Sequence, residues 1–202
     1  MDMPHLSLPT ISRRAFGLTL AGAGVTLLRS QSKEMHWAML SDTHILSDPA
    51  DVSHGFHPTE NLNKAIPAIL AAKPEGALIC GDIVRLQGRP EDYAAIKTLL
   101  TPVTEAMPLA LVLGNHDNRA NMLAEFGANQ KGAQPLKDRH VLVIESAVAR
   151  FIMLDSLVQT NMTPGFLGKA QRTWLDNYLK SAPKLPTLIF VHHTLDDDDG
   201  AL

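Results

Sequence analysis

The amino-acid sequence predicts an α/β fold, in which strands alternate with helices. Short apolar runs alternate along the chain with stretches whose apolar residues recur at helical spacing, and this order is typical of the fold class. The runs are apolar almost throughout, which indicates strands covered on both faces. With 202 residues, 45% of them hydrophobic, the chain is long enough for one domain with a sizeable core.

Six apolar runs are predicted as strands. They span residues 36–41, 76–80, 109–113, 141–145, 151–154 and 185–191. The fourth and fifth runs are expected to pair through a turn near residues 147–150, and the other four are followed at once by polar residues. Open α/β sheets bind ligands at the carboxyl ends of their strands, so we expect these four polar clusters to share one site.

Three stretches are predicted as helices, because each gathers apolar side chains on one face. They span residues 60–73, 91–100 and 169–180. In the first stretch Leu62, Ile66 and Ile69 share a face, and Pro67 indicates a kink or a late first turn.

The first 30 residues are expected to stand apart from the fold. Arg13 and Arg14 precede an apolar run over 18–28, a pattern that resembles a twin-arginine export signal. Residues 15–28 are fewer than the roughly 20 needed to span a bilayer. We therefore expect the twin-arginine export machinery to carry the chain to the periplasm. An uncut signal would leave it tethered to the outer side of the inner membrane, and a disordered N-terminus is the alternative.

Charge and cysteine content exclude several classes of protein. The net charge is −3, and it becomes −5 once residues 1–30, with three arginines and one aspartate, are set aside. An acidic chain without a cluster of Lys or Arg near the polar motifs argues against nucleic acid as a partner. The single cysteine, Cys80, excludes an internal disulfide and a cysteine-rich zinc site.

The four polar clusters contain candidate metal ligands. Their residues are Asp42, His44, Asp82, Asn115, His116, Asp117, His192 and His193. Side chains at i and i+2 of an extended strand point to the same side, so Asp42 and His44 are expected to bind one ion together. Carboxylate, amide and imidazole donors without thiolate suit Mn, Fe or Zn. The ordinary alternative for single residues of this kind is a helix cap or a turn.

In their order, Asp-x-His, Gly-Asp, Gly-Asn-His-Asp and His-His resemble the motifs of the calcineurin-like metallophosphoesterases, over about residues 35–193. The stretch from Asp155 through Gln171 and Trp174 to His192 is most similar to the bacterial cyclic-nucleotide phosphodiesterase subgroup. The resemblance implies a sandwich of two mixed β-sheets flanked by helices, with residues 31–202 as the metallophosphoesterase domain.

The resemblance also implies two divalent metal ions that share one carboxylate. Asp42, His44 and Asp82 would hold the first ion, and the shared Asp82, Asn115 and His192 would hold the second. His193 is the alternative to His192. Two divalent ions with two carboxylates and a bridging hydroxide leave a net charge of about +1, which attracts a phosphodiester anion.

Two further residues receive catalytic roles from the resemblance. His116 would lie beside the scissile phosphate and donate a hydrogen bond to an oxygen of the substrate, and Asp117 would orient His116. The implied activity is hydrolysis of cyclic nucleotides or similar small phosphodiesters by a hydroxide that both metals activate. A phosphomonoesterase or a nuclease of the same family is the alternative enzyme.

The sequence departs from the family pattern at its end. The family continues to a Gly-His-x-His segment, but no histidine follows His193 before Leu202, so the domain is expected to be C-terminally incomplete. The first interpretation is that the chain is a fragment of a longer enzyme. Alternatively, His54, His57 or another subunit supplies the missing ligands, or the protein is a shortened, non-catalytic module that binds metal weakly or not at all.

Overall fold

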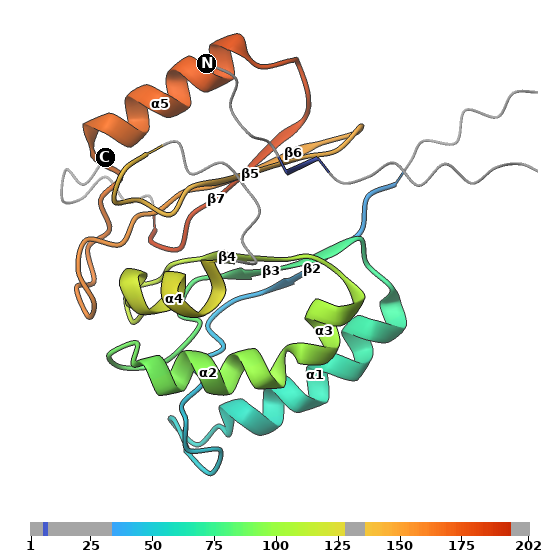
Figure 1. Cartoon of the computed structure of the whole chain (residues 1–202), viewed down its shortest axis with the longest axis vertical. Helices are drawn as coiled ribbons and strands as arrows, with labels where there is room; N and C mark the ends of the chain where they lie inside the picture. Colours follow the sequence, from blue (N-terminus) through green and yellow to red (C-terminus); the bar gives the residue numbers. More distant parts are fainter. Residues whose placement is uncertain (1–5, 8–33, 128–135, 195–202) are drawn as a thin grey trace, which may run out of the picture.

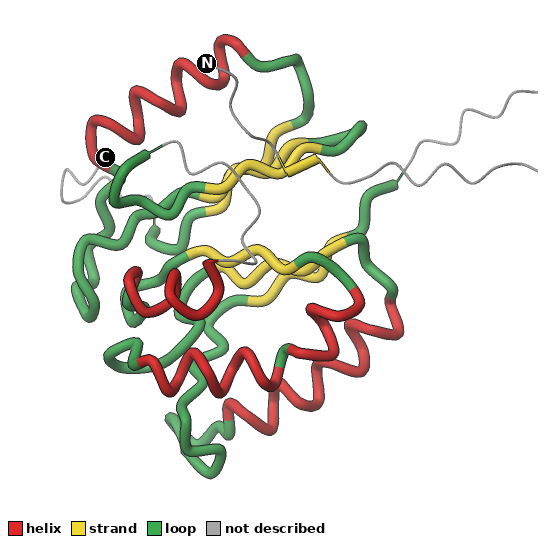
Figure 2. The backbone as a smooth tube through the Cα atoms, in the orientation of Figure 1, coloured by secondary structure: helices red, strands yellow, loops and turns green. Residues whose placement is uncertain are grey.

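Two sheets lie face to face between layers of helices (Figure 1). The computed structural model describes residues 6–7, 34–127 and 136–194. Figure 2 shows the strands gathered in the middle of the molecule and the helices outside them. Among the described residues, no helix has the length and apolar character required to cross a membrane.

The first sheet is parallel over its described strands and has the order β2-β3-β4. Its strands are β2 (Trp37–Leu40), β3 (Gly76–Cys80) and β4 (Leu109–Val112), close to the predicted runs. Helix α1 (Pro58–Ala72) connects β2 to β3, and α2 (Pro90–Leu99) and α3 (Thr101–Ala106) connect β3 to β4. Parallel strands therefore end at the same edge, where the polar clusters follow them.

The second sheet is mixed and has the order β1-β5-β6-β7. Strands β5 (Leu142–Glu145) and β6 (Arg150–Met153) are antiparallel, as the predicted turn requires. Helix α5 (Gly168–Ser181) then leads to β7 (Thr187–Phe190), which pairs in parallel with β6. The predicted sandwich of two sheets flanked by helices is confirmed. Among the described strands, mixed pairing occurs in this sheet, whereas the first sheet is parallel.

The short strand β1 (Leu6–Ser7) comes from the segment that we expected to stand apart. It pairs in parallel with Ile144 and Glu145 of β5, so these two residues belong to the second sheet. The rest of the predicted export signal, including Arg13 and Arg14, lies outside the described residues, and export remains a prediction.

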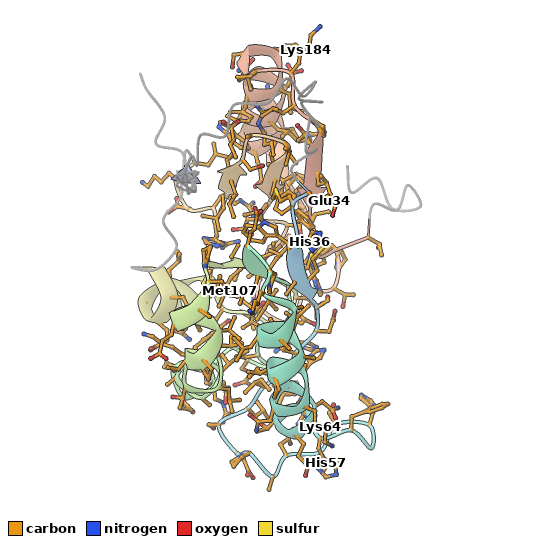
Figure 3. All side chains as sticks on the ribbon, turned by 90° about the vertical axis from the view of Figure 1, so that its right-hand side faces the viewer. Glu34, His36, His57, Lys64, Met107 and Lys184 are labelled. Carbon is orange, nitrogen blue, oxygen red and sulfur yellow. The ribbon has the colours of Figure 1, made fainter. Side chains whose placement is uncertain are left out.

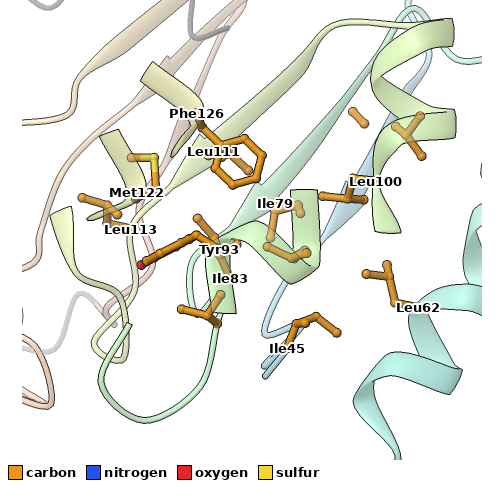
Figure 4. Packing of buried hydrophobic residues seen from close by; sticks show 14 of the residues in the cluster. Ile45, Leu62, Ile79, Ile83, Tyr93, Leu100, Leu111, Leu113, Met122 and Phe126 are labelled. Atoms are coloured by element: carbon orange, nitrogen blue, oxygen red, sulfur yellow. The ribbon is translucent and has the colours of Figure 1, made fainter. Parts of the chain in front are cut away.

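Three apolar clusters hold the layers together. Figure 3 shows the stacking from the side, with Lys64 of α1 near one end and Lys184 beyond α5 near the other. Between the sheets, Leu78 and Val112 belong to the same cluster as Ile144 and Met153. Below the first sheet, Ile79 and Leu111 pack with residues of α1 to α4 (Figure 4). Above the second sheet, Val143 and Ile152 pack against Tyr178 of α5.

Two helical features differ from the sequence-based expectation. Pro67 lies in the interior of α1, which begins at Pro58, and therefore not in a first turn. Leu62 and Ile66 are buried against the first sheet, which favours the helix despite the missing backbone donor. The sequence analysis did not predict α3 or α4 (Arg119–Phe126). Asn118 caps α4 by accepting a hydrogen bond from the backbone of Asn121.

Asp117 ties together the loops that follow β3 and β4. Its side chain is fully buried and accepts hydrogen bonds from the backbone N–H groups of Gly114 (2.8 Å), Ile83 (3.3 Å) and Val84 (3.4 Å). The hydroxyl of Tyr93 also donates to Asp117 Oδ1 at 2.9 Å. Burial raises the pKa of Asp117 to about 6, although these donors favour the charged form. The carboxylate therefore fixes the distance between the two loops.

We predict that Asp117→Asn destabilises the fold. An amide nitrogen in place of one carboxylate oxygen would face hydrogen-bond donors and leave them unpaired. The free energy of unfolding should fall by about 1–3 kcal/mol, measured by urea denaturation. Asp138→Asn is the control, because Asp138 is exposed. Equal unfolding midpoints for both variants would contradict the role of Asp117.

Candidate metal centre

The carboxylate of Asp82 lies at the centre of the polar clusters. Asp82 follows β3 and is 3% exposed. Its Oδ2 lies 3.8 Å from His44 Nε2 and 4.0 Å from His116 Nε2, and its Oδ1 lies 3.6 Å from His192 Nε2. Asn115 joins the cluster because its Oδ1 lies 3.3 Å from His192 Nε2. Four loops from separate parts of the chain thus meet at one buried carboxylate.

Asp42 lies on the exposed side of this cluster. Its Oδ1 lies 3.6 Å from His44 Nε2, and half of its side chain is exposed. The two residues meet as predicted, but the expected reason was wrong. Strand β2 ends at Leu40, and φ is 54° at Asp42 and 47° at His44, so neither residue is extended. Their backbone N–H groups instead donate to the carbonyls of Gly81 (3.1 Å) and Asp82 (3.0 Å).

Strained backbone and glycines bring the ligands close together. Asp82 also has a positive φ, 46°, so three of the predicted ligands adopt a conformation that non-glycine residues usually avoid. A Cβ atom at Gly81 would overlap the ring of His192, and one at Gly114 would overlap the carboxylate of Asp82. Only glycine at these two positions permits the observed approach of the side chains.

The candidate ligand atoms form two groups, and Asp82 belongs to both. One group contains His44, Asp82 and His116, and the other contains Asp42, Asp82 and His192. Within each group the ligand atoms lie within 4.8 Å of one another. The sharing of Asp82 agrees with the predicted arrangement. The partners differ from it, because His116 joins His44 while Asp42 joins the group of His192.

The chemistry of the cluster fits divalent cations. His192 Nδ1 donates to the carbonyl of Cys80 at 3.0 Å, so in the neutral ring the lone pair of Nε2 faces the oxygens of Asn115 and Asp82. Nε2 lies 3.3 Å from Asn115 Oδ1 and 3.6 Å from Asp82 Oδ1. Donors held at about 2.0–2.2 Å from one ion have similar mutual distances. Among the described residues, no Lys or Arg forms an ion pair with Asp82, so a cation would supply the missing counter-charge.

The protonation of His44 is also suited to metal binding. Burial lowers the pKa of His44, and this outweighs the opposing effect of Asp82 and Asp42. The neutral imidazole is the form that binds metal. Cys80, by contrast, lies beside the centre with its Sγ 3.7 Å from the carbonyl of Val191, and burial raises the pKa of its thiol. It therefore adds no thiolate to the donor set.

The two adjacent histidines have different surroundings. His192 faces Asp82, whereas His193 Nδ1 is hydrogen-bonded to the hydroxyl of Ser156 at 2.7 Å. A Cβ atom at Gly165 would overlap the ring of His193. The structure therefore brings His192, the preferred candidate, to the centre, and places the ring of His193 against the loop that follows β6.

The contacts of His116 and Asp117 correct one prediction. Asp117 was expected to orient the ring of His116, but its carboxylate is occupied by the backbone donors and by Tyr93. His116 Nδ1 is instead hydrogen-bonded to Asn161 Oδ1 at 2.7 Å. Asp117 acts on the loops, whereas Asn161 contacts the ring. No motif in the sequence marks Asn161, which lies 45 residues away from His116.

A cleft of about 740 Å³ opens beside the centre. Four candidate ligands and His116 line it, the ligands being Asp42, His44, Asp82 and Asn115. Other lining residues come from the loop after β2, from α1 and from the loop after β3, namely Ser53, His54, Phe56, Asn61, Arg85 and Leu86. His54 thus lines the cleft. His57 caps α1 at the end of the helix layer remote from the sheets (Figure 3) and does not line it.

Comparison with known proteins identifies relatives of this chain. It is 30% identical to a glycerophosphodiester phosphodiesterase of Enterobacter lignolyticus, over 77% of this chain and 55% of the relative. It is also 30% identical to a probable cyclic nucleotide phosphodiesterase of Vesicomyosocius okutanii, over 76% of this chain and 59% of the relative. The chain therefore spans a little over half the length of these curated relatives.

A solved structure and a family pattern complete the comparison. The fold is similar to that of a dimetal phosphatase from Danio rerio, with a TM-score of 0.59 and 15% sequence identity, over 78% of this chain and 69% of the other. The sequence pattern of the calcineurin-like phosphoesterases matches residues 35–201, which include every candidate ligand. The convergence on Asp82 thus lies inside a recognised domain, and the chain belongs to the calcineurin-like phosphoesterase family.

Proposed function

We propose that this chain is a metal-dependent phosphodiesterase that hydrolyses cyclic nucleotides or similar small phosphodiesters. The observation that carries the proposal is the buried carboxylate of Asp82, whose two oxygens face two groups of candidate metal ligands. The family and the names of the relatives support the same reaction class.

The residues that would hold two divalent ions are Asp42, His44, Asp82, Asn115 and His192. When bound, such ions would offset the negative charge of a phosphodiester and lower the pKa of a water molecule. Asp82 is buried, so the inner side of the site has a low dielectric constant. Asp42 is half exposed, so the site is open to solvent on that side. A phosphate can therefore approach from the side of Asp42.

His116 is suited to handle a proton next to the substrate. Its side chain is 31% exposed and lines the cleft, and its Nε2 lies 4.0 Å from Asp82 Oδ2. His116 Nδ1 is hydrogen-bonded to the acceptor Asn161 Oδ1, so Nε2 is the nitrogen free to face a phosphate oxygen. A ring placed in this way can donate to, or accept from, an oxygen of the substrate.

The lining of the cleft favours an organic group attached to the phosphate. Phe56 is 66% exposed and Leu86 is 48% exposed, and both line the same cleft as the candidate ligands. An aromatic face can stack on a nucleobase, whereas a glycerol group would gain less from it. We therefore favour cyclic nucleotides, with glycerophosphodiesters as the second candidate because one relative carries that name.

The cleft offers little to a nucleic-acid strand. Among its described lining residues, Arg85 is the sole Lys or Arg, and Asp51 pairs with it at 2.7 Å. Nucleic-acid grooves combine several cations that follow the phosphate backbone. A nuclease activity is therefore disfavoured.

Asp82→Asn is predicted to lose metal and activity together. The amide supplies one oxygen in place of two, so it cannot serve both ligand groups. Elemental analysis after loading with Mn²⁺ should show a lower metal content, and turnover of bis(p-nitrophenyl) phosphate should disappear. Asp176→Asn is the control, because Asp176 is exposed on α5 and forms an ion pair with Lys180. Retention of the full metal content in Asp82→Asn would contradict the shared role of Asp82.

His116→Ala is predicted to keep its metal and lose turnover. If the ring acts on the substrate, kcat should fall by about 10²–10⁴-fold, the usual contribution of a general acid or base. Metal content is measured in the same samples. Loss of one equivalent of metal would instead make His116 a ligand in the group with His44 and Asp82.

Phe56→Ala is predicted to weaken the use of nucleotide substrates selectively. Loss of base stacking, worth roughly 1–3 kcal/mol, should lower kcat/KM for 3′,5′-cyclic AMP by about 5–100-fold and leave bis(p-nitrophenyl) phosphate less affected. Val52→Ala is the matched control, since Val52 is 49% exposed in the same loop but does not line the cleft. Equal effects of the two variants would argue against stacking at Phe56.

A further inference from the structure

Two residues of the loop after β6 form hydrogen bonds with three consecutive residues of the loop after β4, namely Asn115, His116 and Asp117. The backbone N–H of Asn161 donates to the carbonyl of Asn115 at 2.6 Å, and the hydroxyl of Thr160 donates to the carbonyl of Asp117 at 2.8 Å. Between them, the side chain of Asn161 reaches the ring of His116 at 2.7 Å.

We infer that Asn161 is a positioning residue, which fixes the ring orientation and the tautomer of His116. An amide oxygen can only accept a hydrogen bond, so its contact with Nδ1 places the proton of the neutral ring on Nδ1. Nε2 then keeps its lone pair directed toward Asp82 and the cleft. The same contact persists when the ring is doubly protonated, because Nδ1–H still donates. The amide therefore holds the ring in either charge state.

Other groups around His116 cannot replace this contact. The carboxylate of Asp117 is occupied by the loop backbone and by Tyr93, as described above. The ring of His44 packs edge-on against that of His116, with centroids 5.5 Å apart, and restricts the ring without bonding to Nδ1. Among the described residues, Asn161 thus provides the hydrogen bond that selects one nitrogen of His116.

The backbone of Asn161 explains why an asparagine suits this position. Its φ is 63°, in the left-handed region that asparagine tolerates better than most residues. This conformation lets the backbone N–H reach Asn115 while the side chain reaches His116. One residue thereby links a candidate metal ligand to the group that handles the proton.

The backbone conformation also provides a clean variant. Asn161→Gly keeps a residue that adopts positive φ readily and keeps the N–H donor to Asn115, but it removes the side-chain oxygen. Asn161→Asp keeps an acceptor at the same place. Asp138→Gly is the control for a glycine introduced at an exposed loop position of positive φ, since φ is 61° there.

The decisive measurement is long-range ¹H–¹⁵N NMR of the histidine rings in the metal-free full chain. The His116 signals are assigned by their loss in His116→Ala. We expect the Nδ1–H tautomer in the parent and in Asn161→Asp, and a mixture with Nε2–H in Asn161→Gly. An Nε2–H tautomer in the parent, or an unchanged tautomer in Asn161→Gly, would overturn the inference.

Kinetics then test the catalytic consequence, which rests on the proposed function. Asn161→Gly should lower kcat by about 10–100-fold, as is usual for residues that orient a functional group, with little change in KM. Asn161→Asp should recover most of the rate, and Asp138→Gly should match the parent. A purely structural role predicts instead a lower melting temperature in Asn161→Gly and no rescue by Asn161→Asp. An inactive parent would refute the proposed function, while the NMR result would still decide the role of Asn161.

Discussion

The burial of the Asp82 carboxylate is the constraint on which the rest of the site depends. A carboxylate removed from water costs several kcal/mol unless a counter-charge compensates it, yet among the described residues no Lys or Arg pairs with Asp82. Three histidine rings and the backbone N–H of His116, which donates to Asp82 Oδ1 at 2.9 Å, surround it instead. Gly81 and Gly114 allow this close approach. Such a cluster is poorly balanced without cations and well suited to them. The first sheet creates this situation by ending its parallel strands at one edge.

Three polar side chains of the site, those of Asp82, Asp117 and Asn161, have separate roles. Asp117 is buried and fixes the loops after β3 and β4 to each other. Asp82 faces the two groups of candidate ligands. Asn161 reaches from the loop after β6 and holds the ring of His116. Because each side chain has its own partners, changes at the three positions should affect stability, metal content and ring orientation separately. Measurements of stability, metal content and ring orientation can therefore distinguish the three roles, whereas a loss of activity alone could not.

The sequence predicted the features of this arrangement that depend on residues close together in the chain. Apolar runs located strands β2 to β7 within a residue or two. The motifs at the ends of these strands marked candidate ligands that lie close together in the structure, namely Asp42, His44, Asp82, Asn115 and His192. The local argument for Asp42 and His44 failed, because backbone bonds to the neighbouring loop impose positive φ where an extended chain was expected. Asn161 and Tyr93 were missed because their partners are distant in sequence, and no spacing rule connects them. The roles of neighbouring residues such as Asp117 were likewise decided by tertiary contacts.

The most direct test of the account is the position of bound metal in crystals of the full chain loaded with Mn²⁺. Anomalous scattering at the manganese edge locates the ions independently of the protein atoms. The account predicts two peaks that share the Asp82 carboxylate, one on the side of His44 and one on the side of Asn115 and His192. A single peak that does not contact Asp82, or ions bound only elsewhere on the surface, would contradict it.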